Sequence, residues 1–373
     1  MEDLREIVYN HRKYLNTIAE VGLQEFKTSK YIREKLERIG LEYEEFIKTA
    51  TVGIIKGKNP KKTIAFRADI DGLQTEEGVK HLCGHDAHIS ILLGFVEFLA
   101  KNKEKINDNI VFIFQPAEEG PGGARLLVEE GVLKKYNVDE IYGLHIYPEI
   151  ESGYVGTRPE YFMAQVGDFE INITGKSGHG AMPQNGIDAI IIASNLINTL
   201  QTIVSRNVKP VDTAVLSIGT INGGSRRNII AENVKLEGTI RTFRPEIYEK
   251  MKNRVREICK GLEVMYNCKI EVKINDDYPA VNNDKELYNE FVCALGKDKV
   301  IELVPLMISE DFSYYQKEVK GLFFMLGSRN IEKGFTNGLH NFNFNFDEGV
   351  LFEAIKMYYK LLVYKNSMDK IFE

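Results

Sequence analysis

The sequence has few cysteines, no long hydrophobic run and no targeting segment. Its four cysteines, at positions 83, 259, 268 and 293, lack the spacing of a disulfide framework and are expected to be thiols. The longest apolar runs, such as residues 189–192, are far shorter than the roughly 20 residues of a membrane-spanning helix. The N-terminus, Met1-Glu2-Asp3-Leu4-Arg5, lacks the basic and then apolar layout of a signal peptide. These absences predict a cytoplasmic protein.

The sequence also has no excess of basic residues. It contains 48 Lys and Arg against 54 Asp and Glu, a net charge of −6, and its pI is near 5.8. Nucleic acids and anionic membranes require clustered basic residues, so neither is an expected partner. The 43% hydrophobic and 27% charged content is that of an ordinary globular protein. A length of 373 residues exceeds one compact core and predicts two domains.

The first part of the chain alternates between strand-like and helix-like patterns. We predict helices at 2–19, 28–39, 88–100 and 123–130, and strands at 41–47, 51–57, 63–69, 109–115 and 141–146. The second helix is expected to open with a cap at Thr28-Ser29 and to close at Gly40. Such alternation predicts a mainly parallel sheet covered on both faces, with its chemistry at the carboxyl ends of the strands.

From about residue 166 the pattern changes. Residues 169–174, 189–204, 214–218, 234–242, 246–265 and 269–274 read as strand, helix, strand, strand, helix and strand, the order of a ferredoxin-like unit. After Tyr278-Pro279 the earlier style returns, with elements at 285–295, 322–326 and 350–364. We therefore predict a discontinuous catalytic domain, 1–165 and 278–373, interrupted by an inserted domain, 166–277.

Residues 81–88, His-Leu-Cys-Gly-His-Asp-Ala-His, hold three histidines, one cysteine and one carboxylate. In an extended segment Cys83 and His85 would point to the same side and bind one metal, while Gly84 lets the backbone pass close. The other candidate ligands are Glu119, His145 and His340. Five ligands exceed one tetrahedral site, so two ions that share a bridging thiolate or water are expected. A closed structural zinc site prefers tighter spacing than this set has.

Glu118 and Glu119 follow a predicted strand and suit two different roles. One can bind metal while the other acts as general base, and spacing alone does not assign them. Asp69, at the end of another strand, is expected to hold a ligand in place. His88 is expected to support the site from a helix face rather than to bind metal, and His11 and His81 are assigned to packing or to the surface. A solvated glutamate pair and a core His145 are the alternative interpretations.

Together these residues resemble the dinuclear metallo-amidohydrolases, a family that includes aminoacylases, hippurate hydrolase, carboxypeptidase G, auxin-conjugate hydrolases and N-acetyldiaminopimelate deacetylase. The resemblance extends over essentially the whole chain. It rests on the motifs Phe66-Arg67-Ala68-Asp69-Ile70-Asp71, Cys83-Gly84-His85-Asp86-Ala87-His88, Phe114-Gln115-Pro116-Ala117-Glu118-Glu119-Gly120, Gly143-Leu144-His145, Gly178-His179-Gly180-Ala181-Met182-Pro183, Asn228-Ile229-Ile230-Ala231-Glu232 and Leu339-His340.

The resemblance implies a fold and a set of roles. The fold is α/β, a zinc-exopeptidase-like catalytic domain with an inserted ferredoxin-like α+β domain that acts as lid and dimerisation domain. Two divalent ions, Zn, Mn or Co, would be held by the five ligands named above, with Glu118 as general base and Asp69 as supporting carboxylate. Dimerisation through the inserted domain is a further implication.

The inserted segment contributes three candidates by the same resemblance. His179 is similar to a histidine that helps hold the oxyanion, often in the site of a partner subunit; alternatively it only caps its loop. Asn228 and Arg241 are candidates for gripping the substrate α-carboxylate, with Arg226 and Arg227 as rivals. Arg241 lies on a predicted strand and an ion pair is its alternative role.

The sequence departs from its relatives at two places. Only Gly72 to Leu82 separate Asp71 from Cys83, where relatives carry a longer segment, and Gly180 replaces a frequent alanine. The shortened segment is expected to alter the pocket rim without loss of a ligand, and Gly180 is expected to make the His179 loop more mobile. The leading hypothesis is hydrolysis of N-acyl amino acids to a carboxylate and a free amino acid. N-acetyldiaminopimelate deacetylase and a dipeptidase are alternatives within the class, and a non-catalytic metal-binding protein is the alternative outside it.

Overall fold

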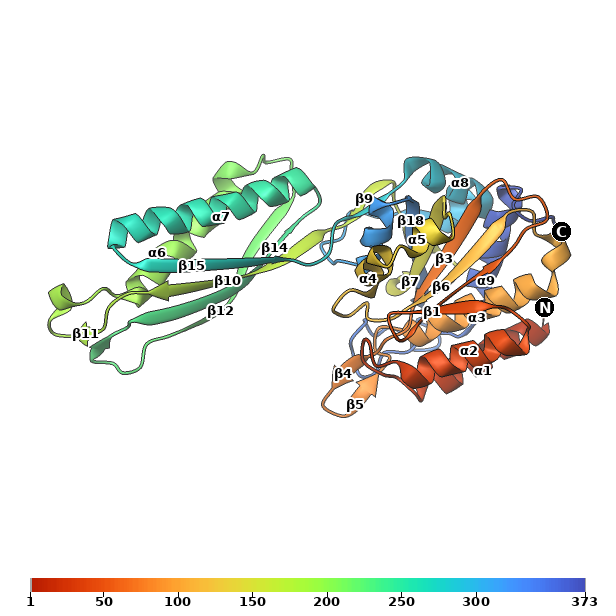
Figure 1. The fold of residues 1–373 in the computed structure, drawn as a ribbon, viewed down its shortest axis with the longest axis horizontal. Coiled ribbons are helices and arrows are strands. Elements are labelled where there is room, and N and C mark those ends of the chain that lie inside the picture. The colour runs from red at the N-terminus through yellow and green to blue at the C-terminus, as the bar shows by residue number, and fades with distance from the viewer. Residues whose placement is uncertain (1, 373) are drawn as a thin grey trace. The chain divides into compact units, whose positions relative to one another are not determined.

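The computed structural model describes residues 2–372, and the contacts within the chain divide it into two compact units. The first unit comprises Met1–Phe162, Val281–Val304 and Asp311–Glu373, and the second comprises Met163–Ala280 and Pro305–Glu310. The second unit is therefore inserted into the sequence of the first, and its ribbon is green and cyan in Figure 1.

The first unit is built on an eight-stranded sheet. Its order is β1 (Tyr43–Phe46), β2 (Ala50–Ile55), β6 (Asn109–Gln115), β3 (Thr63–Asp69), β7 (Glu140–Glu151), β18 (Lys320–Arg329), β8 (Val155–Thr157) and β17 (Val300–Glu302). The four central strands, β6, β3, β7 and β18, are parallel to one another. This confirms the prediction of a mainly parallel sheet.

Helices cover both faces of this sheet (Figure 1). Phe66 of β3 packs against Phe95 of α3 (His85–Lys101) and Tyr358 of α9 (Gly349–Tyr364), with ring centroids 5.0 and 4.6 Å apart. On the other face Phe312 lies so close to Gly143 that a Cβ there would be 2.8 Å from its ring. The remaining helices of the unit are α1 (Glu2–Asn16), α2 (Phe26–Arg38), α4 (Gly123–Glu129), α5 (Val132–Lys135), α8 (Lys285–Leu295) and the 3-10 segments η1 (Lys103–Lys105), η4 (Lys297–Lys299) and η5 (Asp311–Lys317).

Two helix starts differ from the prediction. α2 begins at Phe26, and Thr28 and Ser29 lie buried inside it, where Ser29 Oγ donates to the Thr49 carbonyl over 2.5 Å. The predicted cap at Thr28-Ser29 is therefore wrong, because tertiary contacts recruit hydroxyls that resemble a cap in the sequence. α3 begins at His85, three residues before the predicted start. Cys83 and His85 consequently do not lie in one extended segment.

The second unit is a four-stranded antiparallel sheet in the order β12 (Ala214–Gly223), β14 (Asn233–Thr242), β10 (Gln165–Thr174) and β15 (Lys269–Asp276). The helices α6 (Ala189–Thr202) and α7 (Pro245–Tyr266) pack together, with Ile171, Leu196 and Met251 in their shared core. Asp188 caps α6 by accepting from the Ile190 amide. The element order and strand order are those of a ferredoxin-like unit, which confirms the predicted fold class.

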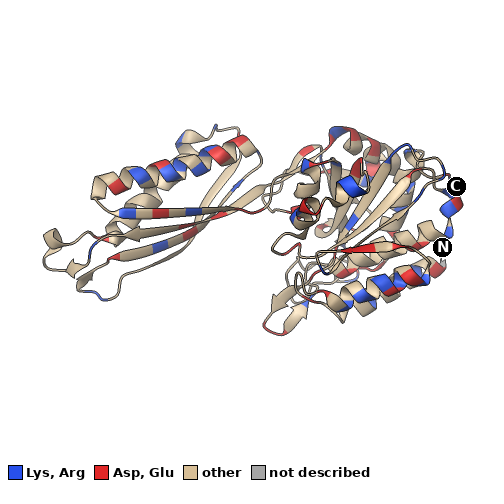
Figure 2. Cartoon of the chain, viewed as in Figure 1, with Lys and Arg blue, Asp and Glu red and all other residues tan. Residues whose placement is uncertain are grey.

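Short elements complete the two units. They are the pair β4 (Leu73–Thr75) and β5 (Gly78–Lys80), the pair β9 (Glu160–Met163) and β16 (Val281–Asn283), the pair β11 (Gly178–His179) and β13 (Ile229–Ile230), the 3-10 segment η2 (Pro183–Asn185) and the π-helical segment η3 (Ile203–Asn207). Acidic and basic residues are interspersed along α2 and α7 (Figure 2). Within residues 2–372, no helix combines the length and apolarity needed to cross a bilayer.

Candidate metal centre

The predicted site residues of the first unit gather at the carboxyl ends of its central strands. Asp69 ends β3, and Glu118 and Glu119 follow β6. His145 lies on β7, two residues beyond the last pairing of β7 with β3, Arg67 with Gly143. β7 runs to Glu151, longer than the predicted 141–146, so His145 projects from a continuous strand rather than from its end.

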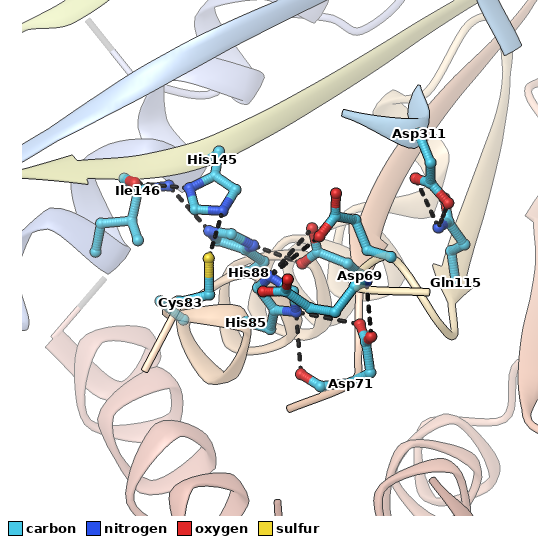
Figure 3. Close-up of polar contacts among 12 residues, drawn as sticks. Asp69, Asp71, Cys83, His85, His88, Gln115, His145, Ile146 and Asp311 are labelled. Carbon is cyan, nitrogen blue, oxygen red and sulfur yellow. Dashed lines mark hydrogen bonds and ion pairs between the residues drawn. The ribbon is translucent and has the colours of Figure 1, made fainter. Parts of the chain in front are cut away.

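Gly84 turns the chain so that Cys83 and His85 both reach this region. Its φ of 82° lies in the left-handed region, and a Cβ on it would stand 2.4 Å from Ile146 Cγ2. Only glycine fits there without moving β7. The turn leads directly into α3, whose first residue is His85, and Figure 3 shows the Cys83 sulfur directed at the His145 ring.

The side chains form overlapping groups of metal-type donors. Cys83, His85 and His145 have donor atoms within 4.8 Å of one another, as do Cys83, Glu119 and His340. Cys83 Sγ lies 3.3 Å from His145 Nε2 and 3.2 Å from His340 Nε2. A third group joins His85, Glu118 and Glu119. The structure thus brings the five predicted ligands and Glu118 together, with Cys83 common to two groups.

The hydrogen bonds of two histidines leave one ring nitrogen of each aimed into this cluster. His145 Nδ1 lies 2.7 Å from the Ile146 carbonyl, so it carries the proton and Nε2 carries a lone pair. His85 Nδ1 lies 3.0 Å from the Asp71 carbonyl and 3.2 Å from Asp71 Oδ1. His85 Nε2 is buried and has no hydrogen-bond partner among residues 2–372. A buried nitrogen lone pair without a partner is costly unless a ligand such as a metal ion occupies it.

His88 is engaged at both ring nitrogens. Nδ1 lies 2.5 Å from Asp69 Oδ1, and Nε2 accepts a hydrogen bond from the Ile146 amide over 2.9 Å. Neither nitrogen is left for a metal ion, and His88 instead joins the end of β3 to β7. His11 and His81 are both buried, and His11 contacts Tyr31 and Glu97 through its ring nitrogens. They fit the packing role predicted for them.

A buried network of polar side chains holds Asp69 in place. The Arg67 side chain is fully buried and donates to Asp69 Oδ2 over 2.9 Å, to Asp311 Oδ1 over 2.7 Å and to Gln115 Oε1 over 2.7 Å. Gln115 Nε2 donates to both Asp311 oxygens, as Figure 3 shows. One arginine thus fixes the ends of β3 and β6 together with the start of η5. Sequence reasoning gave none of these three supporting residues a role.

The local charges explain the protonation of the cluster. Burial pushes the pKa of Asp69 upward, but the neighbouring His85, His88 and Arg67, together with the hydrogen bond to His88, outweigh it and hold that pKa well below its usual range. Burial, and next the neighbouring His88, lower the pKa of His145 well below its usual value. Burial also raises the pKa of the Cys83 thiol. A neutral His145 is a metal ligand already, whereas Cys83 becomes one only when a cation displaces its proton.

Asp71 and Arg12 hold the ligand-bearing segments to one another. Asp71 accepts from His85 Nδ1 and, through Oδ2, from the Glu119 amide over 3.0 Å. Arg12 on α1 pairs with Asp86 on α3 and with Glu348, and its guanidinium lies 4.4 Å from the Phe346 ring centroid. The loop that carries His340 is tied to the Cys83 segment by a bond from the His340 amide to the Leu82 carbonyl, 2.9 Å. The motif Asp69-Ile70-Asp71 contained a signal for Asp71; nothing local marked Arg12.

In the second unit, His179 lies in β11, and Asn228 immediately precedes β13, the strand that pairs with β11. His179 pairs with Ile229, and the Asn228 carbonyl accepts from the Gly180 amide over 2.9 Å. His179 Nδ1 accepts from the Ala181 amide over 3.0 Å, so its exposed ring carries the proton on Nε2. The residue therefore does cap its own turn. It also presents an N–H donor, which the oxyanion role requires.

Arg241 lies far from that pair. It is near the end of β14, opposite Val166 and Val215, and donates to the Met307 carbonyl over 2.9 Å. Asn228 lies beyond the other end of the same strand, so roughly 23 Å of extended chain separates the two, at about 3.3 Å per residue from Val234 to Arg241. Asn228 and Arg241 of one chain therefore cannot hold the same carboxylate.

Comparisons with known proteins agree with this architecture. The model of a family described as peptidase family M20/M25/M40 matches residues 65–364. N-acetyldiaminopimelate deacetylases are similar over nearly the whole length: that of Bacillus pumilus (strain SAFR-032) is 39% identical, covering 95% of this chain and 96% of the relative, and that of Anoxybacillus flavithermus (strain DSM 21510 / WK1) is 40% identical, covering 96% and 97%.

A solved structure points in the same direction. A dinuclear metal-binding peptidase of family M20 from Bacillus subtilis aligns with a TM-score of 0.84 at 30% identity, over 97% of this chain and 98% of that chain. Both the sequence and the fold of this protein are thus similar to those of the same group.

Proposed function

Because the chain belongs to peptidase family M20/M25/M40 and is a hydrolase of carbon–nitrogen bonds, we propose that it removes the acetyl group from N-acetyldiaminopimelate. The observation that carries the proposal is the near 40% identity to N-acetyldiaminopimelate deacetylases over almost the entire chain. The sequence alone ranked general N-acyl amino acid hydrolysis first and this deacetylase second. The similarity to N-acetyldiaminopimelate deacetylases favours the deacetylase over general N-acyl amino acid hydrolysis.

We propose that two divalent metal ions would bind the donor cluster, with Cys83, which belongs to two of the donor groups, among their ligands. The remaining ligands would be His85, Glu119, His145 and His340, each of which shares with Cys83 a group of three residues whose donor atoms lie within 4.8 Å of one another. The donor set of thiolate, imidazole and carboxylate suits Zn, Mn or Co. His85 Nε2, which has no hydrogen-bond partner among residues 2–372, is the atom whose burial an ion would compensate. When bound, the ions supply Lewis acidity, which acidifies water and polarises an amide carbonyl.

The chain's own residues supply the proton transfers and the orientation. Glu118 lies within 3.9 Å of His85 Nε2, so a carboxylate stands beside the proposed metal position. We assign to it the proton of the attacking water, which it then gives to the leaving amine. Asp69 keeps its charge and holds His88 and Arg67 in place.

We further propose that the second unit acts as lid and dimerisation domain. His179 would donate its Nε2–H to the developing oxyanion, a role that lowers the barrier when the donor is already oriented. Asn228 and Arg241 would hold a substrate carboxylate, and their separation within one chain requires that Asn228 and Arg241 act from different subunits or on different groups. A homodimer supplies the first arrangement.

The substrate assignment predicts a strong preference. The purified protein, stripped of metal and reloaded with manganese, cobalt or zinc, is expected to release acetate from N-acetyldiaminopimelate with a kcat/KM at least about 100-fold above that for benzoylglycine. Acetate release and amine formation are measured over a panel of N-acyl amino acids and dipeptides. Equal or faster cleavage of benzoylglycine would restore the general aminoacylase, and cleavage of dipeptides alone would favour a dipeptidase.

The metal assignment predicts a specific loss at Cys83. Cys83→Ser is expected to weaken metal binding at least about tenfold, because a hydroxyl is a poor ligand for soft metals and Cys83 belongs to two of the donor groups. Affinity and stoichiometry are measured by competition with a chelating dye. Cys259→Ser, at a cysteine buried in the second unit, is the matched control and should leave both quantities unchanged. Unaltered metal binding in Cys83→Ser would remove this residue from the site.

A further inference from the structure

The segment between α1 and α2, residues 17–25, lies against both loops that carry the proposed catalytic groups. The Glu20 carbonyl accepts from the Gly72 amide over 2.8 Å, next to Asp71. A Cβ on Gly22 would stand 2.5 Å from the Gly120 carbonyl oxygen and 2.9 Å from Ala117 Cβ. Gly22 therefore packs directly against residues 117–120, with no side chain between them. Any movement of residues 117–120 displaces the 17–25 segment as well.

Glu25 makes the most specific contact of the segment. Its side chain is fully buried, Oε1 accepts from the Ala117 amide over 2.9 Å, and Oε2 accepts from Thr49 Oγ1 over 2.7 Å. No Lys or Arg forms an ion pair with it within residues 2–372. Its two carboxylate oxygens are thus committed to one main-chain amide and one hydroxyl, both on other elements.

The amide that Glu25 accepts belongs to a strained residue. Ala117 has a φ of 58°, in the left-handed region that residues with a Cβ rarely adopt. Its carbonyl accepts from the Gly122 and Gly123 amides over 3.1 and 3.0 Å. This conformation reverses the chain after β6 and sets the direction in which the next two residues leave. Those residues are Glu118 and Glu119.

We propose that Glu25 is a positioning residue for the reaction: by fixing the Ala117 amide it sets where Glu118 and Glu119 stand relative to the other donors. The inference rests on the proposed function for the roles of the two glutamates. Glu25 precedes residues 65–364, the part of the chain that matches the family model. An error of about 1 Å in a reacting group can cost roughly 100-fold in rate, so a hydrogen bond one residue away is sufficient to matter.

The protonation of Glu25 determines which substitution is conservative. Burial raises the pKa of Glu25 to about 7; the Thr49 hydrogen bond opposes this rise and the charge of Asp71 adds to it. A carboxyl that is protonated over part of the neutral range is well imitated by a neutral amide. In Glu25→Gln, Oε1 can still accept from the Ala117 amide while Nε2 donates to Thr49 Oγ1. Glu25→Ala removes the acceptor.

The experiment compares Glu25→Ala, Glu25→Gln and Ser29→Ala in the full chain. Ser29 lies on α2, one turn beyond Glu25, and its removal also loosens the contact with the Thr49 segment without touching Ala117. Hydrogen exchange of residues 117–123 is followed by mass spectrometry on metal-free protein, because this readout needs neither metal nor activity. Glu25→Ala is expected to exchange about tenfold faster there, and Glu25→Gln and Ser29→Ala within about threefold of the parent.

Two functional readouts accompany the exchange. In Glu25→Ala, kcat for N-acetyldiaminopimelate is expected to fall about 10- to 100-fold with KM changed less than about threefold, and Mn²⁺ affinity to fall about tenfold through Glu119. Glu25→Gln should restore both. Should Glu25→Ala not fold, Glu25→Met fills the same space without an acceptor and takes its place.

The outcomes separate this inference from the proposed function. Unchanged exchange at 117–123 in Glu25→Ala, failure of Glu25→Gln to restore it, or equal effects in Ser29→Ala would overturn the positioning role. A parent protein that binds Mn²⁺ but leaves N-acetyldiaminopimelate intact would overturn the substrate assignment, and the exchange and Mn²⁺ affinity of Glu25→Ala would still decide the role of Glu25.

Discussion

Glu118→Ala is expected to reduce kcat for deacetylation by about 10⁴-fold, the upper range for loss of a general base. The carboxylate beside His85 Nε2 is the group placed to take the proton of the attacking water, and alanine offers no substitute. KM should change little, because proton transfer belongs to the transition state and not to substrate binding. Steady-state kinetics on metal-loaded protein measure both constants.

The same variant distinguishes the two glutamates. Metal stoichiometry in Glu118→Ala should remain near that of the parent, whereas Glu119→Ala, which removes the carboxylate 3.7 Å from His340 Nε2, should lose bound metal. Glu119→Ala is thus the matched control at the adjacent position. Loss of metal in Glu118→Ala with retention in Glu119→Ala would exchange the two roles.

Arg67→Met is expected to lower the free energy of unfolding by about 3–5 kcal/mol, the usual cost of removing one partner from a buried ion pair. Arg67 is fully buried between Asp69 and Asp311, so methionine leaves two carboxylates in the interior without their cation. The chain contains no tryptophan, so chemical denaturation is followed by far-ultraviolet circular dichroism, which measures the change in the free energy of unfolding. Arg125→Met, which breaks an exposed pair with Glu129, should have little effect.

A second substitution tests the cause of that loss. If the cost comes from uncompensated carboxylates, adding Asp311→Asn to Arg67→Met should recover part of the stability, because one buried charge disappears while Gln115 and the Ala124 amide keep a partner. A double variant less stable than Arg67→Met by the full effect of Asp311→Asn alone would show instead that lost packing dominates. Parent-like stability of Arg67→Met would contradict the electrostatic account altogether.

The sequence by itself determined the fold class and the candidate donors. Strand and helix periods are local properties, so the alternation before residue 166 and the βαββαβ order after it were readable without coordinates. Cys83 and His85 stood out because they share the histidine-rich run 81–88, and Glu119 and His145 because they lie at or near predicted strand ends. His340 was added as a further histidine beyond the inserted domain. Their roles remain predictions, although the structure brings their donor atoms together.

The tertiary structure alone decided how the site is supported. Arg67 contacts Asp311, 244 residues away in the sequence, and Glu25 contacts Ala117, 92 residues away. Contacts over such separations produce no periodic pattern of residues from which they could be predicted. The same limitation explains the wrong cap at Thr28-Ser29, since these hydroxyls satisfy partners that only folding brings near, and the early start of α3 at His85. Local chemistry selects the groups that react, whereas burial and long-range hydrogen bonds fix where those groups stand, because both depend on the packing of distant segments.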